Sequence, residues 1–170
     1  MQFVPENPLI VQSDHTILLE TQGPHFAAAR DELARFAELV KSPEYMHTYR
    51  LNALSLWNAA SAGLTADEAV ETLSRWAKYP VPPGVPAHVR ETMGRFGRLQ
   101  LRRDDDGGLV LEAHTALLMR ELRGIRKVKP FIGPRIDPTH SRIDEAHRGE
   151  LKQSLIKAGH PVQDLAGFVD

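Results

Sequence analysis

Four prolines fall between positions 80 and 86, and no other feature constrains the fold as strongly: Pro80, Pro82, Pro83 and Pro86. Proline has no amide hydrogen to donate, so neither a helix interior nor a central strand can run through this segment. The chain must therefore fold as one set of elements before the prolines and another set after them. The residues alone favour a boundary between two small modules near Val81, which suits a chain of 170 residues.

Before the prolines, hydrophobic spacing predicts both strands and helices. The expected elements are strands at Leu9–Val11 and Ile17–Leu19 around the turn Ser13–His15, a helix from about Pro24 to Val40, a turn at Ser42–Glu44, a strand at His47–Leu51, a helix around Trp57 that ends at Gly63, and a helix around Leu73 and Trp76. Thr65 and Glu68 form a capping-box pattern at the start of the last helix. Trp57 and Trp76 are expected in the core, because large aromatic side chains bury much area.

After the prolines, the clearest pattern is a β-hairpin, in which Arg98–Arg102 and Leu109–Leu111 flank the turn Asp104–Gly108. The other expected elements are a helix at Pro86–Phe96, a helix at Thr115–Leu122, a strand at Ile125–Ile132, a loop at Gly133–Thr139 and a helix at Ile143–Ala158. The class is therefore α+β. The first module is expected to be helix-rich with a short β-hairpin and winged-helix-like helices, and the second to be a small antiparallel sheet packed by helices.

The residues offer no catalytic or metal site. The sequence contains no Gly-x-x-x-x-Gly-Lys-Ser/Thr loop and no cysteine, so a phosphate-binding loop, a thiolate nucleophile and a zinc ribbon are all missing. His140, Asp144 and His147 have a spacing that a helix would bring to one face, but solvated polar side chains are the interpretation we prefer. Ser13, Asp14 and His15 are adjacent and cannot adopt the geometry of a catalytic triad, so we interpret them as a turn.

The basic residues gather between Arg95 and Arg135, where ten basic and five acidic side chains give a local charge of +5. The net charge of the whole chain is only −1, so any contact with nucleic acid must rest on such a local patch. A strand over Arg126–Lys129 would project both lysines from one face, where they could neutralise phosphates. The alternative is a solvated sheet face that acids balance. The predicted nucleic-acid-binding residues are Arg98, Arg102, Arg103, Arg120, Arg123, Arg126, Lys127, Lys129 and Arg135.

Several phrases of the sequence resemble the bacterial XPB-type DNA repair helicases. They are Asn7–Asp14 with Leu18–Glu20, His47–Leu51, Ser55–Ala59, Ala62–Leu64, Tyr79–Pro82, Arg95–Leu99, Leu155–Val162 and Asp164–Asp170. This family comprises superfamily 2 DNA translocases of nucleotide excision repair. The resemblance implies an XPB N-terminal domain over residues 1–94 and a damage-recognition-like domain over residues 95–170.

The resemblance also implies that the helicase lobes lie beyond Asp170, with the ATPase motifs, the Arg-Glu-Asp loop and the thumb insertion. The chain itself is then expected to be no enzyme and to need no cofactor, whereas the downstream motor would use ATP and Mg²⁺. The expected role is binding of duplex or forked DNA, weakly and without sequence specificity, and regulation of the motor. Expected partners are DNA, the downstream helicase core, and a repair nuclease or another repair subunit.

Two other functions stay open. A protein-interaction module that docks on the helicase core or on a repair partner would expose an apolar patch around the Leu9–Leu19 hairpin or the Trp57 helix. A stand-alone winged-helix regulator would need a more basic third helix than Pro86–Phe96 provides. No apolar run is long enough to span a membrane and no signal peptide opens the chain, so we expect no membrane partner and a cytoplasmic, nucleoid-associated location in a bacterium.

Overall fold

The computed structural model describes residues 3–167 and confirms the α+β class. The chain divides into two compact units, Met1–Gly94 and Arg95–Asp170. The proline cluster lies inside the first unit: Pro80, Pro82 and Pro83 lie between two helices, and Pro86 lies in the first turn of the second of them. The boundary near Val81 that the prolines suggested is therefore wrong. Prolines end regular elements, but the segment that follows them returns to pack on the helices before it.

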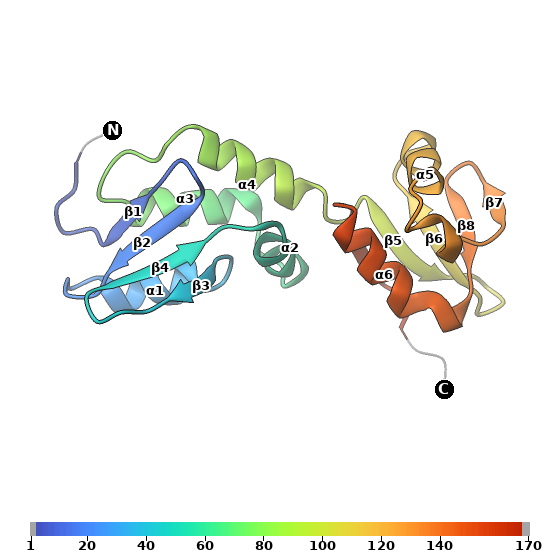
Figure 1. The fold of residues 1–170 in the computed structure, drawn as a ribbon, viewed down its shortest axis with the longest axis horizontal. Helices are drawn as coiled ribbons and strands as arrows, with labels where there is room; N and C mark the ends of the chain where they lie inside the picture. Colours follow the sequence, from blue (N-terminus) through green and yellow to red (C-terminus); the bar gives the residue numbers. More distant parts are fainter. Residues whose placement is uncertain (1–2, 168–170) are drawn as a thin grey trace. The chain divides into compact units, whose positions relative to one another are not determined.

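The first unit is a sheet covered by helices (Figure 1). Its elements are β1 (Leu9–Val11), β2 (Thr16–Glu20), α1 (Phe26–Leu33), β3 (Glu38–Lys41), β4 (Met46–Arg50), α2 (Ala53–Ser61), α3 (Ala66–Trp76) and α4 (Gly84–Gly94). The described strands pair antiparallel in the order β1-β2-β4-β3. Helices α1 and α3 lie on one face of this sheet in Figure 1, and the buried residues of both helices join Leu9, Ile17 and Leu19 in one core.

Local sequence signals set the helix ends of the first unit. The Thr65 hydroxyl accepts a hydrogen bond from the Glu68 amide, and the Glu68 carboxylate accepts one from the Thr65 amide, so the predicted capping box is confirmed. Asn52 and Ser55 form a second such box at α2. Trp57 is buried as predicted, and its indole nitrogen donates to the Thr92 carbonyl at 2.9 Å, which joins α2 to α4.

The second unit is a five-stranded sheet with both helices contributing to one core (Figure 1). Its elements are β5 (Leu99–Arg103), β6 (Leu109–Ala113), α5 (Ala116–Arg123), the 3₁₀ turn η1 (Lys129–Phe131), β7 (Arg135–Asp137), β8 (His140–Ile143), the 3₁₀ turn η2 (Glu145–His147), α6 (Arg148–Lys157) and β9 (Val162–Asp164). The strand order is β7-β8-β6-β5-β9, and β9 alone among the described strands of this sheet runs parallel to its neighbour. Leu99, Leu101 and Leu111 face the helices.

Three predicted elements differ from the structure. The helix expected over Pro24–Val40 ends at Leu33, because the backbone of Glu38–Lys41 pairs with β4 instead of continuing the helix. The strand expected over Ile125–Ile132 is a turn followed by η1. The loop expected over Gly133–Thr139 contains strand β7, which pairs with β8. The helix expected over Ile143–Ala158 is confirmed as α6, although it begins only at Arg148. In the first and third cases the pairing with a neighbouring strand overrides local propensity.

The winged-helix combination is divided between the units. Helices α2, α3 and α4 belong to the first unit, whereas the β5–β6 hairpin belongs to the sheet of the second. The strand expected at His47–Leu51 is confirmed as β4, and the sheet of the first unit contains in addition β3, which we did not expect.

Candidate nucleic-acid interface

The two units carry charges of opposite sign. Residues 1–94 contain 7 basic and 11 acidic side chains, a balance of −4, whereas residues 95–170 contain 14 basic and 11 acidic ones, a balance of +3. A polyanion is therefore attracted to the second unit and repelled by the first. A contact with nucleic acid is therefore expected on the second unit.

The turn after α5 positions two of the predicted cations. The amides of Val128 and Lys129 both donate to the Ile125 carbonyl, at 3.0 and 2.8 Å, and the Val128 side chain is fully buried. This buried anchor holds Arg126 and Lys127 on the outside of the turn, where both are exposed. Their exposure is as predicted, but the cause is a tight turn and not the alternation of a strand.

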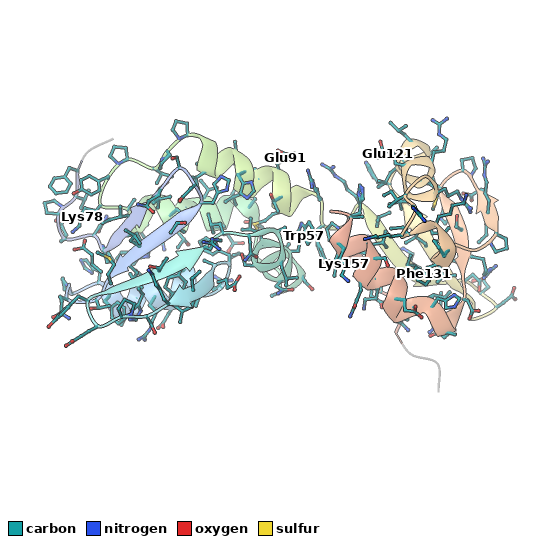
Figure 2. The ribbon with its side chains drawn as sticks, viewed as in Figure 1. Trp57, Lys78, Glu91, Glu121, Phe131 and Lys157 are labelled. Atoms are coloured by element: carbon teal, nitrogen blue, oxygen red, sulfur yellow. The ribbon has the colours of Figure 1, made fainter. Side chains whose placement is uncertain are left out.

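A cavity of about 360 Å³ brings these two cations together with a third. Its lining includes Arg126, Lys127 and Lys157, with Ile125 and Ala158 beside them, and no acidic side chain. Lys157 is the last residue of α6, and Figure 2 shows it at that end of the helix. We call Arg126, Lys127 and Lys157 the basic surface.

Lys157 was missed at the sequence level, although a signal existed. A lysine just before the Ala158–Gly159 helix end is favoured there, because positive charge stabilises the carbonyl end of a helix. Its distance from Arg126 in the sequence hid the fact that the two residues line one cavity.

Three of the predicted residues form ion pairs or hydrogen bonds with other residues of the second unit. Arg102 forms an ion pair with Glu112 at 2.9 Å on the sheet face that points away from the core. Arg103 donates through both terminal nitrogens to Glu145, each at 2.8 Å, which raises its pKa. Arg123 donates to the Ser141 hydroxyl and the Gly133 carbonyl. Because the donor groups of these three side chains are used within the unit, we exclude them from the candidate interface.

The other four predicted residues are exposed: Arg98, Arg120, Lys129 and Arg135. Within residues 3–167, none of the four side chains forms an ion pair or a side-chain hydrogen bond that could neutralise it. Arg98 lines the groove described below, whereas Arg120, Lys129 and Arg135 line neither that groove nor the cavity of the basic surface. The nine predicted residues therefore do not form one surface. Two of them lie on the turn, three are paired within the unit, Arg98 lies in a separate groove, and the remaining three are scattered.

Arg98 belongs to a larger groove of about 570 Å³ beside α5. Its walls include His114, Leu117, Glu121 and His160, and it shares Ala158 with the cavity of the basic surface. Figure 2 labels Glu121 on α5. Burial lowers the pKa of His160, which favours the neutral form of its ring.

His140 and Asp144, which we considered as metal ligands, interact with neighbouring residues of the fold. The His140 ring lies 2.8 Å from the Asp137 carboxylate, and the Asp144 carboxylate accepts a hydrogen bond from the Ala146 amide at the start of η2. Within residues 3–167, no group of three or more His, Asp or Glu side chains is arranged to hold a metal ion. In the same part of the chain, no helix has the length and apolar character that a bilayer span requires.

The apolar patch that a docking module would need is not where we expected it. Leu9, Val11, Ile17 and Leu19 are all buried in the core of the first unit, as is Trp57. The exposed apolar side chains near these elements are Leu54 on α2, and Leu39 and Val40 on the edge strand β3. These core-facing residues of the β1–β2 hairpin are therefore not available for docking.

Two kinds of comparison place the chain among known proteins. The model of the family described as helicase conserved C-terminal domain matches residues 9–137. The protein named DNA 3'-5' helicase XPB of Kineococcus radiotolerans is 47% identical over 165 residues, and the protein of the same name from Mycobacterium tuberculosis is 42% identical over 165 residues. These alignments cover 97% of this chain and 30% of each relative. The chain therefore spans about a third of the length of these curated relatives.

A eukaryotic relative is more distant. The protein named general transcription and DNA repair factor IIH helicase/translocase subunit XPB of Schizosaccharomyces pombe is 32% identical over 125 residues, which cover 73% of this chain and 15% of the relative. The similarity thus extends from bacteria to eukaryotes over a segment that includes parts of both units.

These matches correct one expectation. We expected the chain to be no enzyme, because it lacks a phosphate-binding loop and an ATPase motif. The match to a helicase C-terminal domain over residues 9–137, together with the alignment to the XPB helicases, overturns that interpretation and makes the chain a helicase-region segment. A phosphate-binding loop is one element of a helicase. Its absence from this chain does not define what the chain contributes to the helicase.

Proposed function

The chain belongs to the helicase conserved C-terminal domain family, and on that premise we propose that it is part of an XPB-type DNA repair helicase that holds DNA through the basic surface of its second unit. The observation that carries the DNA contact is the cavity lined by three cations and no acid, in the unit with the positive balance.

Phosphate contacts of this kind position DNA without reading its sequence. Arg126, Lys127 and Lys157 each place a positive charge at the same cavity, and a DNA backbone that lies there releases its condensed counterions. Three such contacts give weak binding, since most of the affinity disappears as salt rises. We expect the surface to accept duplex and forked DNA alike, and to orient a motor located elsewhere in the whole protein.

The same proposal extends to the two units. Residues 1–94 would be the XPB-type N-terminal domain and residues 95–170 the damage-recognition-like domain. Support comes from the two compact units and their opposite charge. The family match runs across the boundary between them, so a limited-proteolysis cut near Arg95 that left two stable pieces would support the division, and collapse of both pieces would contradict it.

Affinity for a 20-base-pair duplex, measured by anisotropy across a salt series, tests the DNA contact. Arg126→Glu with Lys127→Glu should weaken binding at least tenfold at 0.1 M salt and flatten the slope of log affinity against log salt by about 2. Arg35→Glu with Lys41→Glu is the matched control, because both residues are exposed in the first unit and the charge change is equal. Equal binding by both double variants would refute the proposal.

A docking role for the first unit is the second candidate function. The edge strand β3 pairs only with β4 among the described strands, and its residues Leu39 and Val40 are about half exposed. Open strand edges with apolar side chains are typical of surfaces that accept another chain. Loss of binding to the separately expressed helicase core on Leu39→Lys, with DNA affinity unchanged, would favour this role; unchanged binding would exclude β3 from it.

A further inference from the structure

We propose that the groove beside α5 binds one unpaired nucleotide of a DNA strand whose backbone lies on the basic surface, so that the second unit favours single-stranded over duplex DNA. The inference rests on the proposed DNA contact and adds to it a site for the base.

The size of the groove excludes a duplex. A volume of about 570 Å³ lies within the range of small-molecule sites and is too small to take up a double helix. A single nucleotide is the part of DNA that fits such a space. A base that enters it must first leave the stack and the pair.

One side of the groove offers a phosphate contact. The Arg98 side chain is exposed and, among residues 3–167, has no partner that neutralises it. Its backbone is held in place, since the His114 amide donates to the Arg98 carbonyl at 2.8 Å. Gly97 precedes it with φ +94°, a conformation that favours glycine and sets the direction in which the chain enters β5.

The other walls suit a base rather than a second phosphate. Leu117 is 58% exposed although it is a leucine on a helix, and Leu118 and Pro161 continue this apolar lining. The neutral ring of His160 offers a flat surface for stacking. The Glu121 carboxylate repels phosphate but accepts hydrogen bonds from a base amino group, such as that of cytosine.

The groove and the basic surface are neighbours. Ala158 lines both cavities, just after α6 ends at Lys157. A strand whose phosphates contact Lys157 therefore reaches the groove without leaving this end of α6. The proximity explains how a weak electrostatic contact could be converted into a preference for unpaired DNA.

Anisotropy of the full chain with a 12-nucleotide oligo-dC, oligo-dT and a 12-base-pair duplex tests the inference. Arg98→Gln, which removes the phosphate contact of the groove, and, separately, Leu117→Ser, which removes apolar lining from the site of the base, should each weaken oligo-dC binding by about tenfold and leave duplex binding within about twofold. Glu121→Gln should reduce the preference for oligo-dC over oligo-dT. Leu39→Ser, an equally exposed leucine of the first unit, is the control and should change neither.

The outcomes separate the two proposals. If Arg98→Gln and Leu117→Ser leave single-strand binding intact while Arg126→Glu with Lys127→Glu abolishes duplex binding, the groove inference fails and the DNA contact stands. Equal losses on single strands and duplex would also overturn the groove, because they would indicate backbone contact alone. If none of these variants changes binding to any DNA, both proposals fail.

Discussion

Arg148 and Asp164 form a two-point ion pair in which Nε and Nη2 of the arginine donate to the two carboxylate oxygens at 2.9 and 2.8 Å. The pair joins the first residue of α6 to the last residue of β9, and Lys152 adds another donor at 3.1 Å. Both charged groups are largely buried, with side-chain exposures of 10% and 15%. This pair fastens the edge strand β9 to the helix that precedes it.

Removal of the Asp164 carboxylate should lower the stability of the second unit. Asp164→Ala removes the two-point carboxylate partner of the buried Arg148 guanidinium and leaves it the longer contact with Glu145 at 3.2 Å, so we expect the unfolding free energy of the second unit to fall by roughly 3 kcal/mol. Asp105→Ala, an exposed aspartate in the β5–β6 turn, serves as control and should stay within about 0.5 kcal/mol of the original chain. Urea unfolding of the variants measures both values. A loss below 1 kcal/mol for Asp164→Ala would show that this pair does not hold β9.

Acid should destabilise the second unit over a defined range of pH. Burial raises the pKa of Asp164, but hydrogen bonds from Arg148, the Ala166 amide and Lys152 outweigh it and lower the pKa below its usual value. The hydrogen bond with His140 is the main reason why the pKa of Asp137 falls from 3.8 to about 2. Such carboxyls bind protons in the unfolded chain before they do so in the folded one.

Stability from these groups is therefore fully present above pH 5 and declines as the pH falls from about 4 towards 2. Urea midpoints measured from pH 7 to pH 2 follow this decline. The double variant Asp137→Asn with Asp164→Asn should show a shallower decline below pH 4, since two of the groups no longer titrate. An unchanged slope would assign the acid sensitivity to other carboxyls.

The bond between Trp57 and Thr92 should matter to the first unit. Trp57→Phe keeps the apolar bulk in the core but removes the indole donor at 2.9 Å from the Thr92 carbonyl, so we expect a loss of about 1–2 kcal/mol. Leu54→Ala on the exposed side of the same helix should have a much smaller effect. Equal effects of the two substitutions in thermal unfolding would mean that the hydrogen bond contributes nothing beyond packing.

The buried anchor of the turn links stability to DNA binding. Val128→Ala removes two methyl groups from a fully buried position, with an expected cost of about 2 kcal/mol. Because Val128 holds the turn that presents Arg126 and Lys127, duplex affinity should fall severalfold although no charge changes. Lys129→Ala, exposed and outside the cavity, should leave stability unchanged and duplex affinity within about twofold. An intact duplex affinity for Val128→Ala would mean that the turn need not be rigid.

Local patterns predicted the elements whose signals are short-range. The capping box at Thr65 and Glu68, the β5–β6 hairpin and the end of α2 at Gly63, where φ is +98°, all follow from residues within a few positions of one another. The same patterns failed where pairing is remote. Leu39 and Val40 have helical spacing with Leu33 and Phe36, yet they belong to a strand, β3, that pairs with β4.

The candidate interface shows the same limit. Exposure of Arg126 and Lys127 followed from local charge, but the ion pair of Arg103 with Glu145 spans 42 residues, and the bond of Arg123 to Ser141 spans 18. Neither partner has any pattern that points to the arginine. Whether a cation neutralises a phosphate or a neighbouring carboxylate is decided by the fold, and charge counting along the chain cannot separate the two.

The parallel pairing of β9 with β5 also governs the order of events during synthesis. Gln100 and Gln163 hydrogen-bond across this pair although 63 residues separate them, so one edge of β5 stays open until the ribosome has released that whole stretch. Contacts of such long range form slowly, and an uncovered strand invites another nascent chain. In the second unit, a chaperone, or a pause in translation after β9, would therefore protect this edge and improve the yield of folded protein.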